Sequence, residues 1–378
     1  MRGMRVQIAR PWIGDAEQIA VRKVLASGRL IQGEWVARFE AEFARLHGAR
    51  FGVATANGTL ALTAALLAHG VGPGDEVIVP SFSFFATASS VLSVGAQPVF
   101  ADIDEHTLCL SPRCAEAAVT ARTRAVVPVH LFGHLAPMDE LAILCNRRGL
   151  CLIEDAAQAH LATDRGRAAG SWGTAAFSFH ASKNVTTGEG GMVLTNDEAI
   201  ARRLRQLRNQ GRDAGRTHEV MGFNFRVTNL AAAIGLAQLT RLETATQKRV
   251  AHAQRLTAAL ERVKPPHCRD GCRHVFQQYT ARVSDDIDRD AVVQRLNERG
   301  IEARAYYARP IHRQPAFCTR VAETVAALPI TERAARRVLS LPVHPLLTGA
   351  ELDYVVIETN VALRAAPRVN SEAIHCSR

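Results

Sequence analysis

One lysine of this sequence differs from the other three in a way that suits a covalent bond to a carbonyl compound. Lys183 lies in the stretch Phe177-Ser-Phe-His-Ala-Ser-Lys-Asn184, among aromatic and hydroxyl residues and just before a glycine-rich turn. Lys23, Lys248 and Lys264 lie in charged helical or pre-proline segments that are typical of solvated side chains. A lysine amine attacks a carbonyl group when desolvation keeps part of it neutral. Lys183 is therefore the candidate for a Schiff base, and a surface lysine in a loop is the alternative.

Two adjacent carboxylates follow an apolar segment and form the second chemical feature. The sequence Leu152-Ile-Glu-Asp155 predicts a strand that ends in Glu154 and Asp155, whose side chains should then point in opposite directions. A buried carboxylate needs a cationic partner, because an unpaired buried charge is costly. A protonated pyridine nitrogen is such a partner in cofactor-dependent enzymes. Asp155 is the candidate for that role, and capping of the following helix is the alternative.

A glycine and a hydroxyl residue open a predicted helix over residues 59–69. The segment Thr55-Ala-Asn-Gly-Thr59 comes directly before and at the start of that helix. Backbone N–H groups and the helix dipole make such a start a binding site for phosphate. Gly58 and Thr59 are therefore candidate phosphate ligands. The alternative is an ordinary N-cap by Asn57 or Thr59.

Strands and helices alternate from about residue 50 to residue 200, and they must position these side chains. Apolar, β-branched segments predict strands over 76–80, 98–102, 125–129, 150–154, 175–179 and 191–195. Helical patterns lie between several of them, over 59–69, 85–94 and 138–148. This alternation predicts an α/β fold with a mostly parallel sheet covered by helices, which binds ligands at the carboxyl ends of its strands.

The pattern changes in the last third of the chain. Residues 198–262 are rich in helix and charge, and Pro265-Pro266 marks a break. The later segments predict a strand over 275–283, a helix over 289–299, a short extended piece over 305–307 and helices over 331–339 and 349–364. We therefore predict a large domain over 1–245, a smaller α+β domain over 246–364 and a disordered tail over 365–378.

Composition excludes several classes of protein. The chain has 378 residues, of which 47% are hydrophobic, and its formal net charge is +10. The basic residues are spread along the chain without a block of interleaved aromatics, so we expect no nucleic-acid partner. No apolar run approaches the roughly 20 residues of a membrane span, and the first residues lack the apolar core of a signal peptide. A cytoplasmic protein without a membrane partner is the expectation.

The cysteines do not indicate a disulfide framework or a metal centre. All eight are scattered, mostly among apolar neighbours, as is typical of reduced, packed thiols. The segment His267-Cys-Arg-Asp-Gly-Cys-Arg-His274 has a spacing that could bind zinc. No second Cys or His pair lies nearby in sequence, and a strand-like run follows at once. We therefore predict no metal site.

Taken together, these segments resemble the DegT/DnrJ/EryC1/StrS family of fold-type-I aminotransferases, most of which aminate keto-sugars attached to nucleotides. The resemblance covers about residues 8–362. Its motifs are Gly72-Pro-Gly-Asp-Glu-Val-Ile-Val-Pro-Ser81, Pro128-Val-His-Leu-Phe-Gly133, Ile153-Glu-Asp-Ala-Ala-Gln-Ala-His160, the 178–191 segment, Gly222-Phe-Asn-Phe-Arg226 and Ser340-Leu-Pro-Val-His-Pro345.

The resemblance implies pyridoxal 5′-phosphate (PLP) as the cofactor and assigns a role to residues around its ring. Lys183 would hold PLP as a Schiff base and move the proton between the substrate's Cα and the cofactor's C4′. Asp155 would pair with the pyridine nitrogen, and Gln158 would lie near the 3-hydroxyl group. Phe84 would stack on the ring.

The resemblance also implies how the phosphate is held. Gly58, Thr59 and Ser178 would bind the phosphate group from the same subunit. Asn224 would reach it from the neighbouring subunit, which makes the protein a homodimer with a shared site. From the residues alone, packing of the loop around Asn224 is the simpler interpretation.

The expected reaction is transfer of an amino group, with L-glutamate as donor and a nucleotide-linked keto-sugar as acceptor, in aminodeoxysugar biosynthesis. Amination of a keto-cyclitol in an aminoglycoside-type pathway is the nearest alternative. A dehydratase of the same family would carry histidine in place of Lys183, and a non-catalytic regulatory homologue would not require an intact set of site residues. His180-Ala181 replaces the commoner aromatic-proline pair before the lysine and leaves the substrate open.

Overall fold

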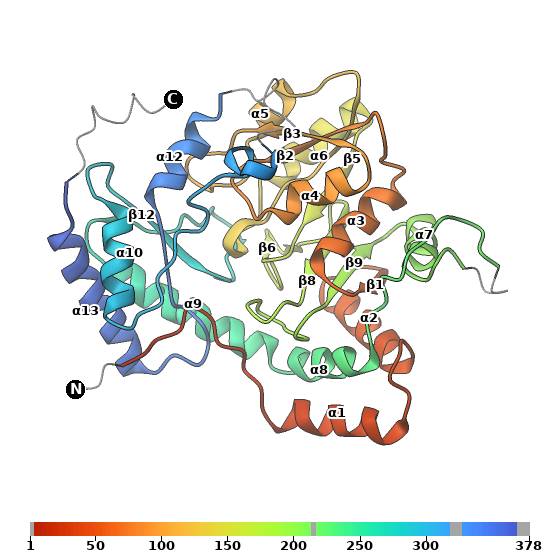
Figure 1. Cartoon of the computed structure of the whole chain (residues 1–378), viewed down its shortest axis with the longest axis horizontal. Helices are drawn as coiled ribbons and strands as arrows, with labels where there is room; N and C mark the ends of the chain where they lie inside the picture. Colours follow the sequence, from red (N-terminus) through yellow and green to blue (C-terminus); the bar gives the residue numbers. More distant parts are fainter. Residues whose placement is uncertain (1–3, 213–216, 318–326, 369–378) are drawn as a thin grey trace.

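A seven-stranded sheet forms the centre of the larger part of the chain (Figure 1). The computed structural model describes residues 4–212, 217–317 and 327–368. The order of the strands is β1-β9-β8-β5-β4-β2-β3, and β9 runs against the other six. The strands are β1 (Phe51–Thr55), β2 (Glu76–Pro80), β3 (Gln97–Ala101), β4 (Thr123–Val126), β5 (Cys151–Asp155), β8 (Thr174–Ser178) and β9 (Gly191–Thr195). The predicted mostly parallel α/β sheet is confirmed.

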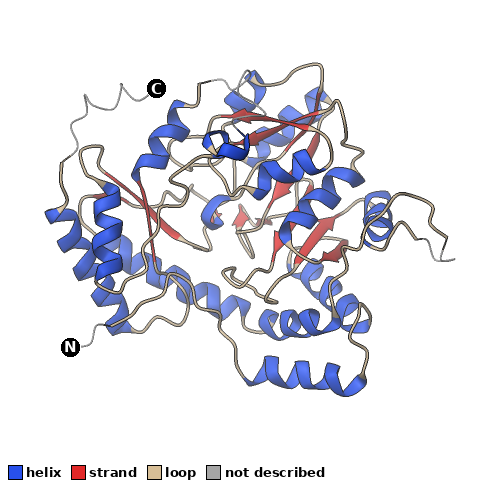
Figure 2. Cartoon of the chain, in the orientation of Figure 1, coloured by secondary structure: helices blue, strands red, loops and turns tan. Residues whose placement is uncertain are grey.

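Side chains alternate between the two faces of this sheet, as the pleat of a strand requires. Val53 and Val193 belong to one apolar cluster, whereas Ala54 and Leu194 belong to another. Helices supply the rest of these clusters, so that the parallel strands are buried on both faces (Figure 2). The first cluster includes residues of α3 (Gly58–Ala68), α4 (Ala86–Ser93) and α7 (Glu198–Arg208). The second includes residues of α2 (Glu34–Leu46) and α8 (Asn229–Leu239). A third includes residues of α5 (Pro112–Ala117) and α6 (Met138–Arg148).

A three-stranded antiparallel sheet forms the centre of a separate apolar cluster, shown on the left of Figure 1. Its order is β10-β12-β13, with β10 (Val263–Lys264), β12 (Tyr279–Val283) and β13 (Val338–Leu341). The helices around it are α9 (Leu242–Ala259), α10 (Arg289–Glu298) and α13 (Gly349–Ala365). Helix α9 runs unbroken through residues 245 and 246. The division of the chain into domains at that point stays a prediction.

The remaining described elements connect these two parts. A small third sheet has the order β11-β6-β7, with β6 (Thr163–Asp164), β7 (Arg167–Ala168) and β11 (Cys272–Arg273). Because β11 follows the break at Pro266, this sheet joins the last third of the chain to the segment after β5. Helix α1 (Asp15–Ser27) lies along α8 (Figure 1), and α12 (Pro329–Arg337) precedes β13.

Two predicted extended segments are wrong in part. The strand predicted over 275–283 begins only at Tyr279, because Val275 and Gln278 donate their backbone N–H groups to the carbonyls of Gly133 and Phe132 instead of to a strand. Residues 305–307 form a turn, which a hydrogen bond from the Ala308 N–H to the Ala305 carbonyl closes. Both segments reach toward the large sheet.

Two further structural facts concern the chain ends and the membrane. Asp288 donates its backbone N–H to the carbonyl of Pro367, so the first residues of the predicted tail are in contact with the loop before α10. Residues 369–378 of that tail lie outside the described residues. No helix in the described part of the chain is long and apolar enough to span a bilayer.

Candidate active site

Lys183 and Asp155 follow or end neighbouring strands at the carboxyl end of the sheet. Asp155 is the last residue of β5, and Lys183 lies in the turn after β8, which pairs with β5. The Lys183 N–H donates to the carbonyl of His180 at 2.9 Å, which fixes the turn. Burial lowers the pKa of Lys183 to about 8, although the negative charge of Asp155 acts in the opposite direction. The amine is thus partly neutral near physiological pH, as a nucleophilic lysine requires.

The Asp155 carboxylate is buried and oriented by neutral donors. Thr87 on α4 donates its hydroxyl to Oδ2 at 2.8 Å, and the Ala157 N–H donates to Oδ1 at 3.2 Å. The Ser83 hydroxyl lies 2.8 Å from that of Thr87. Burial raises the pKa of Asp155, against the effects of these hydrogen bonds and of the Lys183 charge. Within the described residues no ion pair joins this carboxylate, and the nearby charge of Lys183 does not offset its burial.

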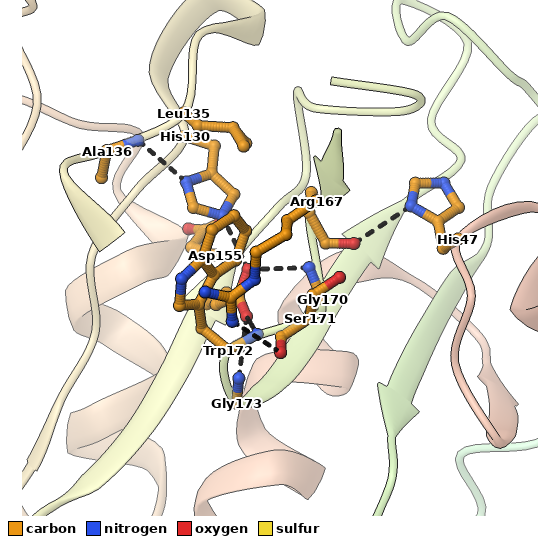
Figure 3. A network of polar contacts seen from close by, with 12 residues as sticks. His47, His130, Leu135, Ala136, Asp155, Arg167, Gly170, Ser171, Trp172 and Gly173 are labelled. Atoms are coloured by element: carbon orange, nitrogen blue, oxygen red, sulfur yellow. Dashed lines mark hydrogen bonds and ion pairs between the residues drawn. The ribbon is translucent and has the colours of Figure 1, made fainter. Parts of the chain in front are cut away.

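Glu154, the preceding residue, is fully buried and all its hydrogen-bond partners lie within the chain. Figure 3 labels these partners, which are His130, Gly170, Trp172 and Gly173. One oxygen of Glu154 accepts from His130 Nε2 at 2.9 Å and from the Gly170 N–H at 2.7 Å. The other accepts from the N–H groups of Trp172 and Gly173, both at 3.0 Å. Burial alone would raise the pKa of Glu154, but these donors hold it below its usual value. The predicted opposite orientation of the two carboxylates is therefore confirmed.

His130 connects Glu154 to the backbone at the end of β5. Its Nδ1 accepts from the Ala136 N–H at 3.2 Å, which assigns the ring proton to Nε2 and makes that atom the donor to Glu154. The His130 N–H donates to the carbonyl of Asp155 at 3.0 Å. The loop that follows His130 is thus fixed against the end of β5, and Phe132 belongs to this loop.

Gln158 is held between that loop and a tyrosine from the last third of the chain. Its Oε1 accepts from the Phe132 N–H at 2.6 Å, and its Nε2 donates to the Tyr307 hydroxyl at 3.1 Å. Tyr307 lies in the turn that was predicted to be extended, and its ring neighbours are Phe132, Phe82 and Phe84. Burial raises the pKa of Tyr307, so the hydroxyl stays neutral. Sequence reasoning missed this residue.

Phe84 is placed as a ring-stacking residue would be. It follows β2 in the chain and is 59% exposed, which is unusual for a large aromatic side chain. Its ring centroid lies 6.4 Å from that of Tyr307, which contacts Gln158. An aromatic face therefore lies open beside the polar groups of the site.

The start of α3 meets the end of β8. A Cβ atom added to Gly58 would lie 2.7 Å from the Ser178 Cβ, so only glycine allows this approach. Asn57 caps α3 by accepting from the Leu60 N–H at 2.9 Å, which confirms the N-cap alternative for Asn57. The Thr59 side chain is exposed, and the Ser178 hydroxyl accepts from the His180 N–H at 3.3 Å. A helix start of this kind is a favourable place for a phosphate group.

The Asn224 side chain is exposed and contacts none of these groups within the described chain. Its backbone segment pairs with Asn209, and the next residue, Phe225, accepts from the Ala56 N–H at 2.9 Å, just before the start of α3. No hydrogen bond in the described chain joins Asn224 to the other candidate residues. Apolar side chains next to it are also exposed, with Met221 at 88% and Phe223 stacked on Phe225. Such an apolar surface is typical of a contact with another chain.

The histidine and cysteine segment after Pro266 does not form a metal centre in the described part of the chain. No three His, Cys, Asp or Glu side chains gather there or elsewhere in the described residues in a way that could hold a metal ion. The Cys268 thiol lies 3.2 Å from the Cys272 carbonyl, and His274 stacks on Phe276.

Known proteins show what this arrangement belongs to. The model of the DegT/DnrJ/EryC1/StrS aminotransferase family matches residues 11–359. The chain belongs to this family. It is 41% identical over 362 residues to GDP-perosamine synthase of Caulobacter vibrioides, covering 93% of this chain and 96% of that protein. It is also 42% identical to a protein of Geobacillus stearothermophilus named "Pleiotropic regulatory protein", covering 88% of this chain and 91% of that one.

A solved structure agrees with the fold. A sugar-aminotransferase homologue of Streptococcus pneumoniae, solved in its PLP form, superposes with a TM-score of 0.91 at 25% identity and covers 96% of this chain and 99% of its own. The family and this structure imply PLP as the cofactor.

The described residues fit PLP on independent observations. The buried Asp155 carboxylate has two neutral donors and no direct ion pair, which a pyridinium nitrogen would supply. The Gly58 start of α3 offers free N–H groups to a phosphate. The open ring of Phe84 and the low pKa of Lys183 suit an aromatic aldehyde. The role of each residue stays a proposal.

A first prediction follows from the satisfied carboxylate. Glu154→Gln places an amide NH₂ among N–H donors and should lower the free energy of unfolding by about 3 kcal/mol at pH 7.5, as measured by urea denaturation. The pKa of Glu154 is lowered in the folded protein, so the wild-type advantage is present above the pKa of an unfolded glutamate, about 4.3. It is lost as pH falls through the folded pKa. The exposed Glu140→Gln is the matched control, and an equal effect of both variants would contradict the network's role.

A second prediction concerns the coupling between Lys183 and Asp155. The rate at which the apoenzyme captures PLP covalently should rise with pH, with a midpoint near the Lys183 pKa of about 8, because only the neutral amine attacks. Asp155 raises that pKa, so Asp155→Asn should move the midpoint to lower pH. Stopped-flow absorbance measures the rate. The exposed Asp139→Asn should leave the midpoint unchanged, and an upward shift in Asp155→Asn would refute the coupling.

Proposed function

We propose that this aminotransferase moves an amino group from L-glutamate to a keto-sugar that is linked to a nucleotide. The observation that carries the proposal is a partly neutral lysine near a buried carboxylate that forms no described ion pair. The substrate class is supported by the 41% identity to GDP-perosamine synthase over almost the full length of both chains. The cytoplasmic location stays a prediction.

In this proposal each residue of the site has one task. Bound PLP supplies an electron sink that makes the α-proton of the amino donor acidic. Asp155 keeps the pyridine nitrogen protonated, and Thr87 holds the carboxylate in the orientation for it. Lys183 accepts the proton from the donor's Cα and delivers it to the cofactor's C4′. Its lowered pKa suits it to both steps.

The other residues orient the cofactor and enclose its ring. Gln158, fixed by Phe132 and Tyr307, lies near the cofactor's hydroxyl group. Phe84 covers one face of the ring and excludes water from it. Gly58, Thr59 and Ser178 hold the phosphate. The glycine allows the close approach of α3 to β8, and the hydroxyls complete the set of donors.

We further propose a homodimer in which Asn224 completes the phosphate site of the partner subunit. The proposal is supported by the exposed Asn224 side chain, which has no described hydrogen bond to the candidate residues of its own subunit. The exposed apolar side chains of Val220, Met221 and Phe223 beside it suit a subunit contact.

A regulatory role is the second candidate, because a 42% identical relative is named a regulatory protein. A regulator that binds PLP without turnover would take up the cofactor but fail to transfer the amino group. The Lys183 and Asp155 pair favours the enzyme, since binding alone needs no amine of lowered pKa.

A third prediction tests the enzyme itself. The purified protein should absorb at roughly 410–430 nm through the lysine-bound cofactor. It should aminate at least one nucleotide-linked ketone, scored by mass, with L-glutamate as donor. Lys183→Ala should lose the absorbance band and at least about a thousandfold of the turnover, since nucleophile and proton carrier disappear together. Lys23→Ala is the control. Borohydride reduction that labels another lysine would overturn the assignment, and a free keto-cyclitol as the preferred acceptor would change the substrate class.

A fourth prediction tests the shared site by subunit exchange. Mixing Lys183→Ala with Asn224→Ala chains should restore activity, because each mixed dimer then has one site without a lesion beside one with both. Equal mixing should give about a quarter of the wild-type rate, since about half of the dimers are mixed and each has one intact site. Native mass spectrometry confirms the exchange. If Asn224 serves its own subunit, every site stays damaged and mixing restores nothing.

A further inference from the structure

A cleft beside Lys183 has a strongly one-sided charge. It lies between the segment at Arg10, the turn at Lys183 and the start of α9, and its volume of about 340 Å³ includes space that is open to solvent. Four of its lining side chains are basic, namely Arg10, Lys183, Arg241 and Arg249, and none of the described residues that line it is acidic. Asp155, Gln158 and Phe84 do not line it, so Lys183 is the residue that the cleft shares with the cofactor site.

Arg249 is the most unusual of these residues. It is only 6% exposed, and its Nη1 donates weakly to the carbonyls of Phe276 and Gln277, each at 3.4 Å. Its Nε has no hydrogen-bond partner, and no carboxylate of the described chain forms an ion pair with it. Burial lowers the pKa of this guanidinium to about 10.

Two other arginines of the described chain have a carboxylate partner: the buried Arg208 pairs with Glu40, and the partly buried Arg241, in the same cleft, pairs with the buried Glu17. The buried Arg282 is in no described ion pair either, but it lies outside the cleft and donates to the carbonyl of Glu105. A buried charge without a counter-ion destabilises a protein, so a residue of this kind indicates an anion that arrives from outside. Planar guanidinium groups bind carboxylates with two parallel hydrogen bonds.

We propose that Arg249 binds the carboxylate of the amino donor. The inference rests on the proposed function, in which the donor's nitrogen must reach the position of the Lys183 amine. The donor's carboxylate is attached to the carbon that bears this nitrogen, so its binding group must line the same cleft as Lys183. Arg249 does so, and the cofactor's phosphate has its own donors at Gly58 and Ser178.

Binding to the apoenzyme tests the site without the reaction. Glutarate, a dicarboxylate without an amine, should bind to the wild-type apoenzyme in a calorimeter. Arg249→Met should weaken that binding about 10- to 100-fold, the effect of removing one or two charge-assisted hydrogen bonds. Arg249→Lys, which keeps the charge but not the planar fork, should fall between the two. Pyrophosphate, which represents the acceptor's anion, should bind to the wild-type apoenzyme no better than it binds to Arg249→Met. The proposal would be overturned if pyrophosphate displaced glutarate from the wild type and this displacement were lost in Arg249→Met.

Stability distinguishes ligand binding from a structural role. Without a counter-ion, Arg249 should cost stability, so Arg249→Met should melt at the same or a higher temperature than the wild type. Arg241→Met is the matched variant from the same cleft, and it should melt lower because it leaves Glu17 buried and unpaired. An Arg249→Met protein that fails to fold, melts lower or loses its dimer would overturn the proposal and show a structural or intersubunit partner.

Kinetics separates this inference from the proposed function. Arg249→Met should raise the KM for L-glutamate at least tenfold, while the amine-loaded enzyme transfers to the keto-sugar at an unchanged rate. If amination proceeds with the wild-type KM for glutamate, the Arg249 inference fails and the function remains. If glutarate binds through Arg249 but no ketone is aminated, the function fails and the carboxylate site remains.

Discussion

The organisation of the site depends on how the end of β5 treats two adjacent carboxylates. A strand turns successive side chains to opposite faces, so Glu154 and Asp155 meet different surroundings although they are neighbours in sequence. Glu154 accepts four hydrogen bonds and is complete within the chain. Asp155 accepts two from neutral groups and forms no ion pair among the described residues, although the charge of Lys183 acts on it. The first carboxylate stabilises the fold, and the second is left for a ligand.

Glu154 also helps to position the residues around Asp155. Glu154 fixes the His130 ring, and the His130 backbone binds the end of β5. The loop that follows then presents the Phe132 N–H to Gln158, which in turn binds Tyr307 from the last third of the chain. A buried network of this kind is worth more as a unit than as separate pairs, because the loss of one member leaves others unsatisfied. The position of Gln158 beside Asp155 thus depends on a residue that faces away from the site.

The sequence alone predicted those site residues whose neighbours in the sequence are distinctive. Lys183 is recognisable among four lysines by its apolar and hydroxyl neighbours, and Asp155 by its place at the end of an apolar strand. Alternation over residues 59–195 predicted six of the seven strands, because a buried parallel strand needs an unbroken apolar run. The seventh, β1, was not predicted, and neither were the two helices before it. Residues 275–278 were wrongly assigned to a strand, since an apolar run does not tell whether its N–H groups bind a strand or the loop at Gly133.

The residues that escaped prediction act through contacts distant in sequence. Thr87 lies in an ordinary helix, and its bond to Asp155 spans 68 positions. Arg249 had a local signal, because the buried positions of α9 include Leu242, Ala245, Arg249, Ala253 and Leu256 at helical spacing. A charged residue within such an apolar stripe is exceptional.

The charges left uncompensated in the folded chain form a pattern of opposite signs. Neither Asp155 nor Arg249 forms an ion pair among the described residues, although the charge of Lys183 acts on Asp155. Each buried charge carries a desolvation cost, which a ligand group of the opposite sign would offset. Under the proposed function, a pyridinium nitrogen suits Asp155 and a donor carboxylate suits Arg249, because either group would meet a like charge at the other position. The charges that lower the stability of the unliganded protein would then direct the cofactor and the donor to separate places, and binding of either would stabilise the fold by mass action.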